Sequence, residues 1–325
     1  MLKALIESRQ CLAIMGPTAS GKSQLSMLLA ELMPIEIISV DSALIYKQMD
    51  IGTAKPTRSE IEQVPHHLIN THDPLDTYSA SDFVDDVNAL VEEIFAREHL
   101  PVLVGGTMMY FNALQQGLSD LPPAHPIIRE KLLAEWQATP ELLHEKLLAI
   151  DPESAARIHQ NDPQRLVRAL EVYEVTGKTL TEFRSQPKQG LTGFSLIKIA
   201  LIPQDRAKLH GQIKKRFLQM VESGFLQEMK TLYERGDLSV DMTSMRSVGY
   251  RQGWLLMSGE YDYDTFIEKS LVATRQLAKR QLTWLRKEKQ LYIIDPYKSS
   301  PSERLQQVLK LLEEKSKDNK TSQVN

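Results

Sequence analysis

Short apolar runs alternate with stretches of helical periodicity in the first third of the chain. Residues 11–16, 35–40 and 101–104 form such runs, and each has the length of a buried strand. Between them, residues 22–33 have helical composition, and residues 80–98 repeat apolar side chains on one helical face. Strands that alternate with helices predict a parallel sheet with helical crossovers, whose functional groups lie at the carboxyl ends of the strands.

The pattern changes after about residue 117. As far as residue 193, helix-like runs are separated by prolines and contain few β-branched stretches, which predicts an all-helical insertion. The elements predicted after it are a strand at 194–202, helices at 205–236, 246–258 and 262–287, and a short strand at 291–294. The whole pattern predicts an α/β protein with helices on both faces of a parallel sheet.

The 325 residues are enough for more than one domain. We predict a core in two parts, at 1–116 and 194–314, with the helical insertion domain at 117–193 between them. The polar residues 315–325 predict a disordered tail. The single cysteine, Cys11, lies in an apolar run and is expected to be a buried thiol.

The net charge of -3 hides an asymmetry along the chain. Residues 1–117 hold 7 Lys and Arg against 15 Asp and Glu, a balance of -8, whereas residues 198–290 hold 17 against 11, a balance of +6. A polyanion is therefore expected on the later segment, unless these charges only solvate helix faces. No apolar run approaches the ~18 residues that span a bilayer, so we expect a cytoplasmic protein without membrane contact.

One motif indicates phosphate chemistry. Residues 16–23, GPTASGKS, match the P-loop pattern G-x-x-x-x-G-K-[ST] between a predicted strand and a predicted helix. In a P-loop, successive backbone N–H groups converge on phosphate oxygens at the positive end of a helix. Lys22 then supplies a mobile positive charge, and the Ser23 hydroxyl is expected to be a ligand of Mg²⁺.

A carboxylate follows the second predicted strand rather than the third. The strand at 101–104 leads into Gly105, Gly106 and Thr107, where common nucleotidases have an aspartate that helps to hold Mg²⁺. Asp41 instead follows the strand at 35–40. This position predicts that Asp41 faces the same crevice as the P-loop, where its carboxylate would be a base or a metal partner. The alternative is that Asp41 caps a helix after it.

Several motifs in this order resemble the bacterial tRNA dimethylallyltransferase family, also called tRNA isopentenyltransferases. They are GPTASGKS at 16–23, SVDSALIYKQMDIGTAKPT at 39–57, VGGTMMY at 104–110, NDPQRLVRALEVYEVTGK at 161–178, SMRSVGYRQ at 244–252 and ATRQLAKRQLTWLR at 273–286. The resemblance implies transfer of the dimethylallyl group of dimethylallyl diphosphate to N6 of the adenosine 3′ of the tRNA anticodon, with release of diphosphate. It also implies a P-loop core and an insertion that clasps the anticodon stem-loop.

The resemblance assigns roles to individual positions. Asp41 matches the general base, Thr107 is expected close enough to assist, and Ser23 stands where the family often has threonine. The positions that match diphosphate-binding residues are Gly16, Thr18, Ala19, Ser20, Gly21, Lys22 and Ser23. The positions that match tRNA-contacting residues are Asp41, Ser42, Ala43, Leu44, Thr107, Arg129, Gln164, Arg165, Leu166, Val167, Arg168, Ala169, Arg246, Ser247, Val248, Gly249, Tyr250 and Arg251.

A basic helix face is predicted near the end of the core. Arg275, Lys279 and Arg286 are spaced by four and seven residues and share this face, with Arg280 on the same segment. We expect all four to bind tRNA, and the alternative is an ordinary solvated surface. The aromatic rings of Tyr250 and Trp254 are expected either to stack on bases or to lie in the core, where aromatics at helical spacing are more often found.

Two other functions compete with tRNA prenylation. Nucleoside and nucleotide kinases also combine a P-loop, a parallel sheet and a helical lid, but the aspartate missing after the strand at 101–104 and the basic later segment disfavour a kinase. A non-catalytic RNA-binding protein would leave the Asp41 crevice without a use. We therefore expect a monomeric, Mg²⁺-dependent enzyme whose substrates are dimethylallyl diphosphate and the tRNA anticodon stem-loop.

Overall fold

The chain forms two compact units. The computed structural model describes residues 1–185 and 190–322, so residues 186–189 of the predicted insertion and 323–325 of the predicted tail lie outside the description. A core unit consists of Met1–Ala113 and Leu191–Asn325, and a helical unit consists of Leu114–Gly190.

The core unit is built on a parallel sheet. Within the described residues, six strands pair in the order β3-β2-β4-β1-β5-β6. The strands are β1 (Gln10–Met15), β2 (Ile35–Val40), β3 (His66–His67), β4 (Leu100–Gly105), β5 (Ser195–Leu201) and β6 (Leu291–Ile294). The interior strands β1, β2 and β4 are buried almost throughout, which is why they are near-continuous apolar runs in the sequence.

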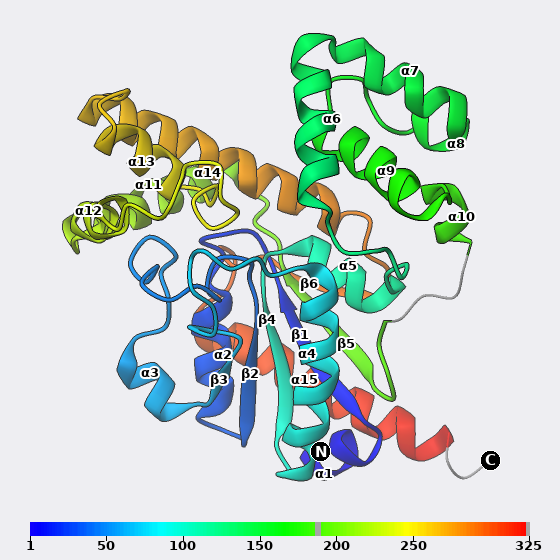
Figure 1. Cartoon of the computed structure of the whole chain (residues 1–325). Helices are drawn as coiled ribbons and strands as arrows, with labels where there is room; N and C mark the ends of the chain where they lie inside the picture. Colours follow the sequence, from blue (N-terminus) through cyan, green and yellow to red (C-terminus); the bar gives the residue numbers. More distant parts are fainter. Residues whose placement is uncertain (186–189, 323–325) are drawn as a thin grey trace. The chain divides into compact units, whose positions relative to one another are not determined.

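Helices cover both faces of this sheet (Figure 1). The helices outside the insertion are α1 (Leu2–Glu7), α2 (Lys22–Ala30), α3 (Arg58–Gln63), α4 (Ala80–Ala96), α5 (Met108–Gln116), α11 (Arg206–Glu222), α12 (Phe225–Glu234), α13 (Tyr250–Met257), α14 (Tyr263–Leu285) and α15 (Pro301–Ser322). Leu5 of α1, Leu29 of α2 and Val308 of α15 pack with strand residues in one apolar cluster, and α4 lies on the opposite face. No helix in the described part of the chain is long and apolar enough to cross a membrane.

The described residues of the helical unit contain helices and no strand. These helices are α6 (Pro126–Ala138), α7 (Pro140–Ile150), α8 (Pro152–Ala155), α9 (Pro163–Thr176) and α10 (Leu180–Arg184). The prolines that separate helix-like runs in the sequence open α6, α7, α8 and α9, because the first helical position needs no backbone N–H. The predicted fold class, a parallel α/β core with an all-helical insertion, is thus confirmed.

Several local predictions differ from the structure. The helix predicted at 205–236 is divided into α11 and α12 at Gly224, whose φ of 104° is not helical. The disordered tail predicted from residue 315 is wrong as far as Ser322, because α15 continues there. Extending an existing helix costs far less than starting one, and Lys315 pairs with Asp318 one turn away at 3.3 Å. The two-residue strand β3 was not predicted, since it is too short to show a pattern.

A buried carboxylate ties β2 to its neighbours at the amino end of the sheet. Glu36 is 2% exposed, and its oxygens accept hydrogen bonds from Arg97 Nε at 2.8 Å and Arg97 Nη2 at 2.9 Å. His67 Nε2 lies 2.7 Å and His99 Nδ1 2.9 Å from the same carboxylate. Burial raises the pKa of Glu36, but the hydrogen bonds from Arg97 and His67 outweigh burial and lower this pKa to about 2.

The Glu36 cluster should make stability depend on pH. Because the folded pKa lies below the ordinary 4.5, ionised Glu36 stabilises the fold above pH 4.5, and this contribution is lost as the pH falls towards 2. We expect Glu36→Gln to lower the free energy of unfolding at neutral pH by about 3 kcal/mol, with a smaller loss in acid. Urea unfolding between neutral pH and pH 3.5 measures this difference.

The matched control is Glu62→Gln, since Glu62 is exposed and pairs with Arg58 across the helix surface. It should leave the unfolding free energy nearly unchanged at every pH. If Glu36→Gln lowers the free energy of unfolding by the same amount at neutral and acid pH, the lowered pKa of Glu36 is contradicted.

Candidate active site

The P-loop lies between β1 and α2, as the motif predicts. Ala19 and Gly21 have positive φ angles of 62° and 87°, and α2 begins at Lys22 directly after them. Glycine adopts the left-handed conformation without a Cβ penalty, so Gly21 allows the chain to enter the helix at a sharp turn. Thr18, Ala19, Lys22 and Ser23 border a cavity of about 180 Å³. The positive end of α2 therefore lies at this cavity.

The order of the strands brings Asp41 to the same cavity. The carboxyl ends of β2, β4 and β1 are neighbours in the sheet, and they lead into Asp41, Gly106 and the P-loop respectively. Asp41 Oδ1 accepts a hydrogen bond from the Ala43 amide at 2.9 Å. A turn follows Asp41 instead of a helix, so the alternative of a helix cap is wrong. The carboxylate is oriented by its own turn at the cavity wall.

Thr107 lies beside this turn. Its amide donates a hydrogen bond to Val40 O at 3.1 Å, and its Oγ1 accepts one from the Ser42 amide at 3.2 Å. These two bonds join the turn after β4 to the turn after β2. The threonine hydroxyl is thus held next to Asp41.

Two cations share the cavity with Asp41. Lys22 Nζ donates to Pro17 O at 2.9 Å. Burial among protein atoms, and then the charge of Arg216, lower the pKa of Lys22 to about 8, while Asp41 opposes this shift. Arg216, from α11, also lines the cavity, and burial lowers its pKa while Asp41 raises it. Two partly desolvated positive charges therefore lie near one carboxylate, which suits a multiply charged anion.

Arg216 was not predicted from the sequence, although a signal was present. It is one of three consecutive basic residues in a helix whose buried positions include Ile213 and Phe217. Arg216 follows Ile213 by three residues, so it lies close to the buried face and not on the solvent side. A basic residue near an apolar helix face has to find a partner or a ligand.

Gln281 connects the P-loop to α14. Its Oε1 accepts from the Thr18 amide and its Nε2 donates to Gly106 O, both at 2.9 Å, and the residue is 8% exposed. The amide of Thr18 is thus used within the protein, so Thr18 has only its side chain left for a ligand. Ser20 Oγ is buried without a hydrogen-bond partner among the described residues.

Apolar side chains complete the cavity. Ile213, Phe217 and Met220 of α11 and Leu277 of α14 border it, opposite polar groups of the P-loop. Figure 1 shows α11 to α14 beyond the carboxyl ends of the strands, where the turns after β1, β2 and β4 lie. One cavity therefore offers an anion site, a carboxylate and an apolar wall.

Comparison with known proteins shows which family the chain belongs to. Residues 44–288 match the family model described as IPP transferase. A curated tRNA dimethylallyltransferase from Hydrogenovibrio crunogenus is 62% identical over 309 residues, which cover 95% of each chain. The chain belongs to the IPP transferase family.

Solved structures of the IPP transferase family share the fold. The full-length tRNA isopentenylpyrophosphate transferase from Bacillus halodurans has a TM-score of 0.72 at 35% identity, over 98% of this chain and 100% of that one. A eukaryotic dimethylallyltransferase acting on tRNA has a TM-score of 0.72 at 31% identity, over 89% of this chain and 74% of that one.

The tRNA positions inferred from the IPP transferase resemblance fall into separate groups. Asp41, Ala43 and Leu44 border the cavity, as do the four residues Ser247 to Tyr250. Ser42, Arg246 and Arg251 are exposed. Seven of these residues of the core unit thus border one cavity.

Tyr250 is a core residue. It is 0% exposed, its ring packs edge-on against Phe225 with centroids 5.2 Å apart, and its hydroxyl donates to Glu228 Oε1 at 2.6 Å. Stacking of Tyr250 on a base is therefore excluded in this conformation, and its place among tRNA-contacting residues is corrected. The Trp254 ring packs against Tyr233, with centroids 4.8 Å apart.

The predicted basic face forms a groove between α11 and α14. Arg275, Lys279 and Arg286 border this groove of about 330 Å³. Arg206 and His210 of α11 border it as well, which the sequence pattern of α14 alone does not reveal. Arg280 lies outside this groove, in a second one that it lines with Trp284.

In the helical unit, two predicted arginines share one buried carboxylate. Arg129 Nη2 and Arg168 Nη1 donate to Glu171 Oε2 at 2.9 and 2.8 Å, and Glu171 is 0% exposed. The side chains of Leu166, Val167 and Ala169 lie in the apolar core of this unit, so their predicted contact with tRNA is corrected. They occupy the inner face of the amphipathic helix α9, while Gln164 and Arg165 are exposed.

Lys22 should make anion binding depend on pH. Because its pKa is lowered to about 8, the lysine loses its charge as the pH rises through 8, and a bound anion loses an attractive partner. We expect the affinity for inorganic diphosphate with Mg²⁺ to fall by up to about tenfold from pH 7 to pH 9. Titration calorimetry measures the Kd at each pH.

Lys22→Arg is the control, because a guanidinium stays charged over this range. Any titration of the diphosphate itself affects both proteins alike. If the unchanged protein and Lys22→Arg show the same pH dependence, the lysine does not titrate in the site.

Proposed function

We propose that this protein transfers the dimethylallyl group of dimethylallyl diphosphate to N6 of the adenosine 3′ of a tRNA anticodon and releases diphosphate. The observation that carries the proposal is the cavity in which the P-loop faces Asp41 and an apolar wall. A phosphoryl-transfer enzyme needs its metal-binding aspartate near the γ-phosphate, whereas the β4 end offers Gly105 and Gly106. The kinase alternative is therefore not favoured.

Asp41 is the proposed base. The exocyclic amine of adenine is a weak nucleophile because its lone pair is delocalised into the ring. As its nitrogen bonds to C1 of the dimethylallyl group, the C–O bond to the diphosphate breaks, and the diphosphate leaves with the electron pair. The amine proton passes to Asp41, whose carboxylate the Ala43 amide orients, and the Thr107 hydroxyl beside it assists.

The P-loop is proposed to hold a leaving group. Lys22, Arg216 and the amino end of α2 are positioned where negative charge develops on the departing diphosphate. The apolar side chains of α11 receive the dimethylallyl group and limit the access of water to a reactive carbon centre. No phosphoryl group is transferred in this reaction.

The donor set of the cavity fits Mg²⁺ bound together with its substrate. Among the described residues, no three His, Cys, Asp or Glu side chains form a cluster that could hold a metal by itself. Mg²⁺ commonly takes one or two protein oxygens and completes its shell with water and phosphate oxygens. The Ser23 hydroxyl, which borders the cavity, is the ligand we infer. Bound there, Mg²⁺ would neutralise charge on the diphosphate.

The tRNA is proposed to bind through its phosphates along the basic groove between α11 and α14. Exposed Arg246 and Arg251 are inferred to contact it near the cavity, since they flank Ser247 to Tyr250. In the helical unit, the inferred contacts are Arg129, Gln164, Arg165 and Arg168, whose side chains are at least partly exposed. A monomer in the cytoplasm remains our expectation for the active enzyme.

Transfer of label tests the function directly. The purified protein is given isotope-labelled dimethylallyl diphosphate, Mg²⁺ and unmodified tRNA with an adenosine 3′ of the anticodon, beside an assay for ATP hydrolysis. We expect label in the tRNA without ATP turnover. ATP turnover with unlabelled tRNA instead supports a kinase or a nucleotidase.

Asp41→Asn tests the base. The amide keeps the shape of the side chain and can still accept from the Ala43 amide, but it cannot take the proton. We expect transfer to slow by about 10²- to 10⁴-fold, while tRNA affinity changes little. Single-turnover rates and filter-binding titrations measure the two quantities. A transfer rate close to that of the unchanged protein would show that Asp41 is not the base.

Arg275→Ala and Lys279→Ala test the basic groove. Each should reduce the slope of log affinity for tRNA against log salt by about 0.7 to 0.9, the effect of one lost phosphate contact. Lys230→Ala is the control, because Lys230 lies on α12 and pairs with Glu234 at the surface. If the slopes match the control, the groove is an ordinary solvated surface and does not bind tRNA phosphates.

A further inference from the structure

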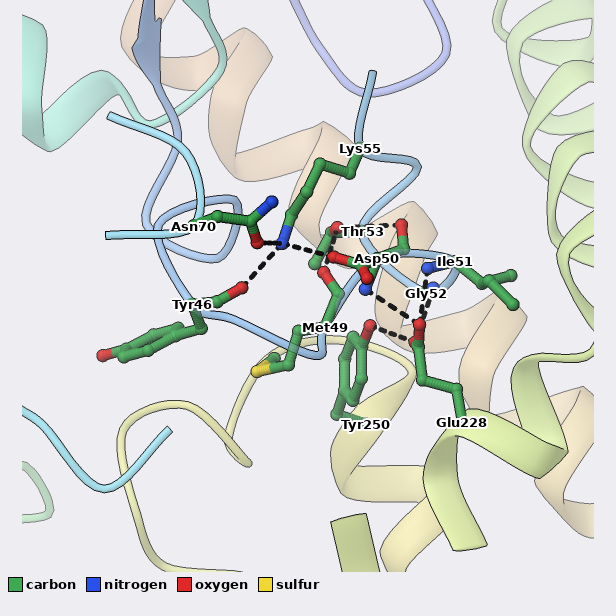
Figure 2. A network of polar contacts seen from close by, with 10 residues as sticks. All are labelled: Tyr46, Met49, Asp50, Ile51, Gly52, Thr53, Lys55, Asn70, Glu228 and Tyr250. Carbon is green, nitrogen blue, oxygen red and sulfur yellow. Dashed lines mark hydrogen bonds and ion pairs between the residues drawn. The ribbon is translucent and has the colours of Figure 1, made fainter. Parts of the chain in front are cut away.

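A carboxylate on α12 accepts four hydrogen bonds, three of which hold a loop at the cavity (Figure 2). Glu228 Oε2 accepts from the amides of Asp50 and Ile51 at 2.8 and 2.7 Å, and Oε1 accepts from the amide of Gly52 at 3.1 Å. The Tyr250 hydroxyl donates the fourth bond, at 2.6 Å. Three successive amides that converge in this way form an anion nest, and the protein's own carboxylate fills it.

The same loop is fixed on its other side. Lys55 Nζ donates to Tyr46 O, Asp50 Oδ1 and Asn70 Oδ1, each at 2.6 Å, and Thr53 Oγ1 donates to Met49 O at 2.7 Å (Figure 2). A loop without regular secondary structure is thus held by side chains at both ends. Such pre-organisation matters where a loop forms part of a site.

The inner surface of the loop is a wall of the cavity. Gly52, Thr53 and Ala54 border it, and Arg216 Nη2 donates to Thr53 O over 3.5 Å. A Cβ at residue 52 would overlap the Phe225 ring, so only glycine lets the loop lie this close to α12. The carboxylate at the back of the loop and the guanidinium at its front are therefore connected through a few backbone atoms.

The loop also separates the cavity from a second, open groove. Ala54, Arg216 and Met220 border both the cavity and this groove of about 850 Å³. A loop that moved away from α12 would merge the two spaces and release Arg216 towards solvent. The three hydrogen bonds from the loop amides to Glu228 oppose this movement.

We propose that Glu228 is a positioning residue for the diphosphate donor. It holds residues 50–53 in place and through Thr53 fixes the Arg216 guanidinium where the diphosphate binds. This inference rests on the function proposed above. Glu228 itself does not border the cavity, so its proposed effect on the diphosphate passes through the loop that it holds.

Glu228→Gln tests the proposal. Glutamine has one carbonyl oxygen, and its amide N–H groups face the loop amides without accepting from them. We expect the KM for dimethylallyl diphosphate and the Kd for inorganic diphosphate with Mg²⁺ to rise by about tenfold, with kcat and the tRNA KM changed by less than about twofold. Glu234→Gln, a surface carboxylate on the same helix, is the matched control and should change neither constant.

A double-mutant cycle separates positioning from general damage. If Glu228 acts through Arg216, Glu228→Gln should change the diphosphate Kd by less than about twofold when Arg216 is already alanine. The proposal is overturned if Glu228→Gln changes the diphosphate Kd equally with arginine and with alanine at residue 216. An unchanged KM for dimethylallyl diphosphate also overturns it, and so does a fall in kcat with both KM values unchanged. If Glu228→Gln does not fold, Glu228→Asp keeps the charge on a shorter side chain and is held to the same criteria.

The unchanged protein distinguishes this proposal from the function on which it rests. Label transfer to tRNA by the unchanged protein supports the transferase reaction, whatever Glu228→Gln does. If no label is transferred, the proposed function fails, while the diphosphate Kd values of the variants still test the link between Glu228 and Arg216.

Discussion

The parallel pairing of β2, β4 and β1 is the constraint on which the site depends. Because the three strands are neighbours and point the same way, their carboxyl ends deliver Asp41, the Gly105–Thr107 turn and the P-loop to one edge. Thr107 joins the first two turns by hydrogen bonds, and Gln281 joins the P-loop to Gly106. The groups of the proposed active site are therefore attached to strands and helices of the core unit.

The cavity combines charges that oppose one another. Lys22 and Arg216 are crowded by protein atoms, which lowers the pKa of both, and Asp41 partly offsets the repulsion between them. A diphosphate that enters this cavity meets positive groups already in place, so little reorganisation is needed as charge develops on it. The same carboxylate serves as the proposed base. In the proposed reaction, one cluster thus joins leaving-group stabilisation to proton removal.

Helices after β5 supply what the P-loop core lacks. Helix α11 contributes Arg216 and much of the apolar wall, and α14 contributes Gln281 on its inner side and basic residues on its outer side. Helix α14 therefore contacts the P-loop and forms one side of the groove inferred to bind tRNA. Helix α12 adds Glu228, which holds the loop at the far wall of the cavity.

Short-range patterns in the sequence determined five of the six strands described in the sheet, the P-loop and the place of Asp41, because apolar runs and a strand–loop–helix motif are local signals. Only the tertiary structure decided which side chains reach the cavity. Arg216, Gln281 and Glu228 act on partners more than 150 residues away, and Tyr250 and Leu166 are core residues within motifs assigned to tRNA. Burial and long-range hydrogen bonds depend on how distant helices pack, which no local pattern encodes.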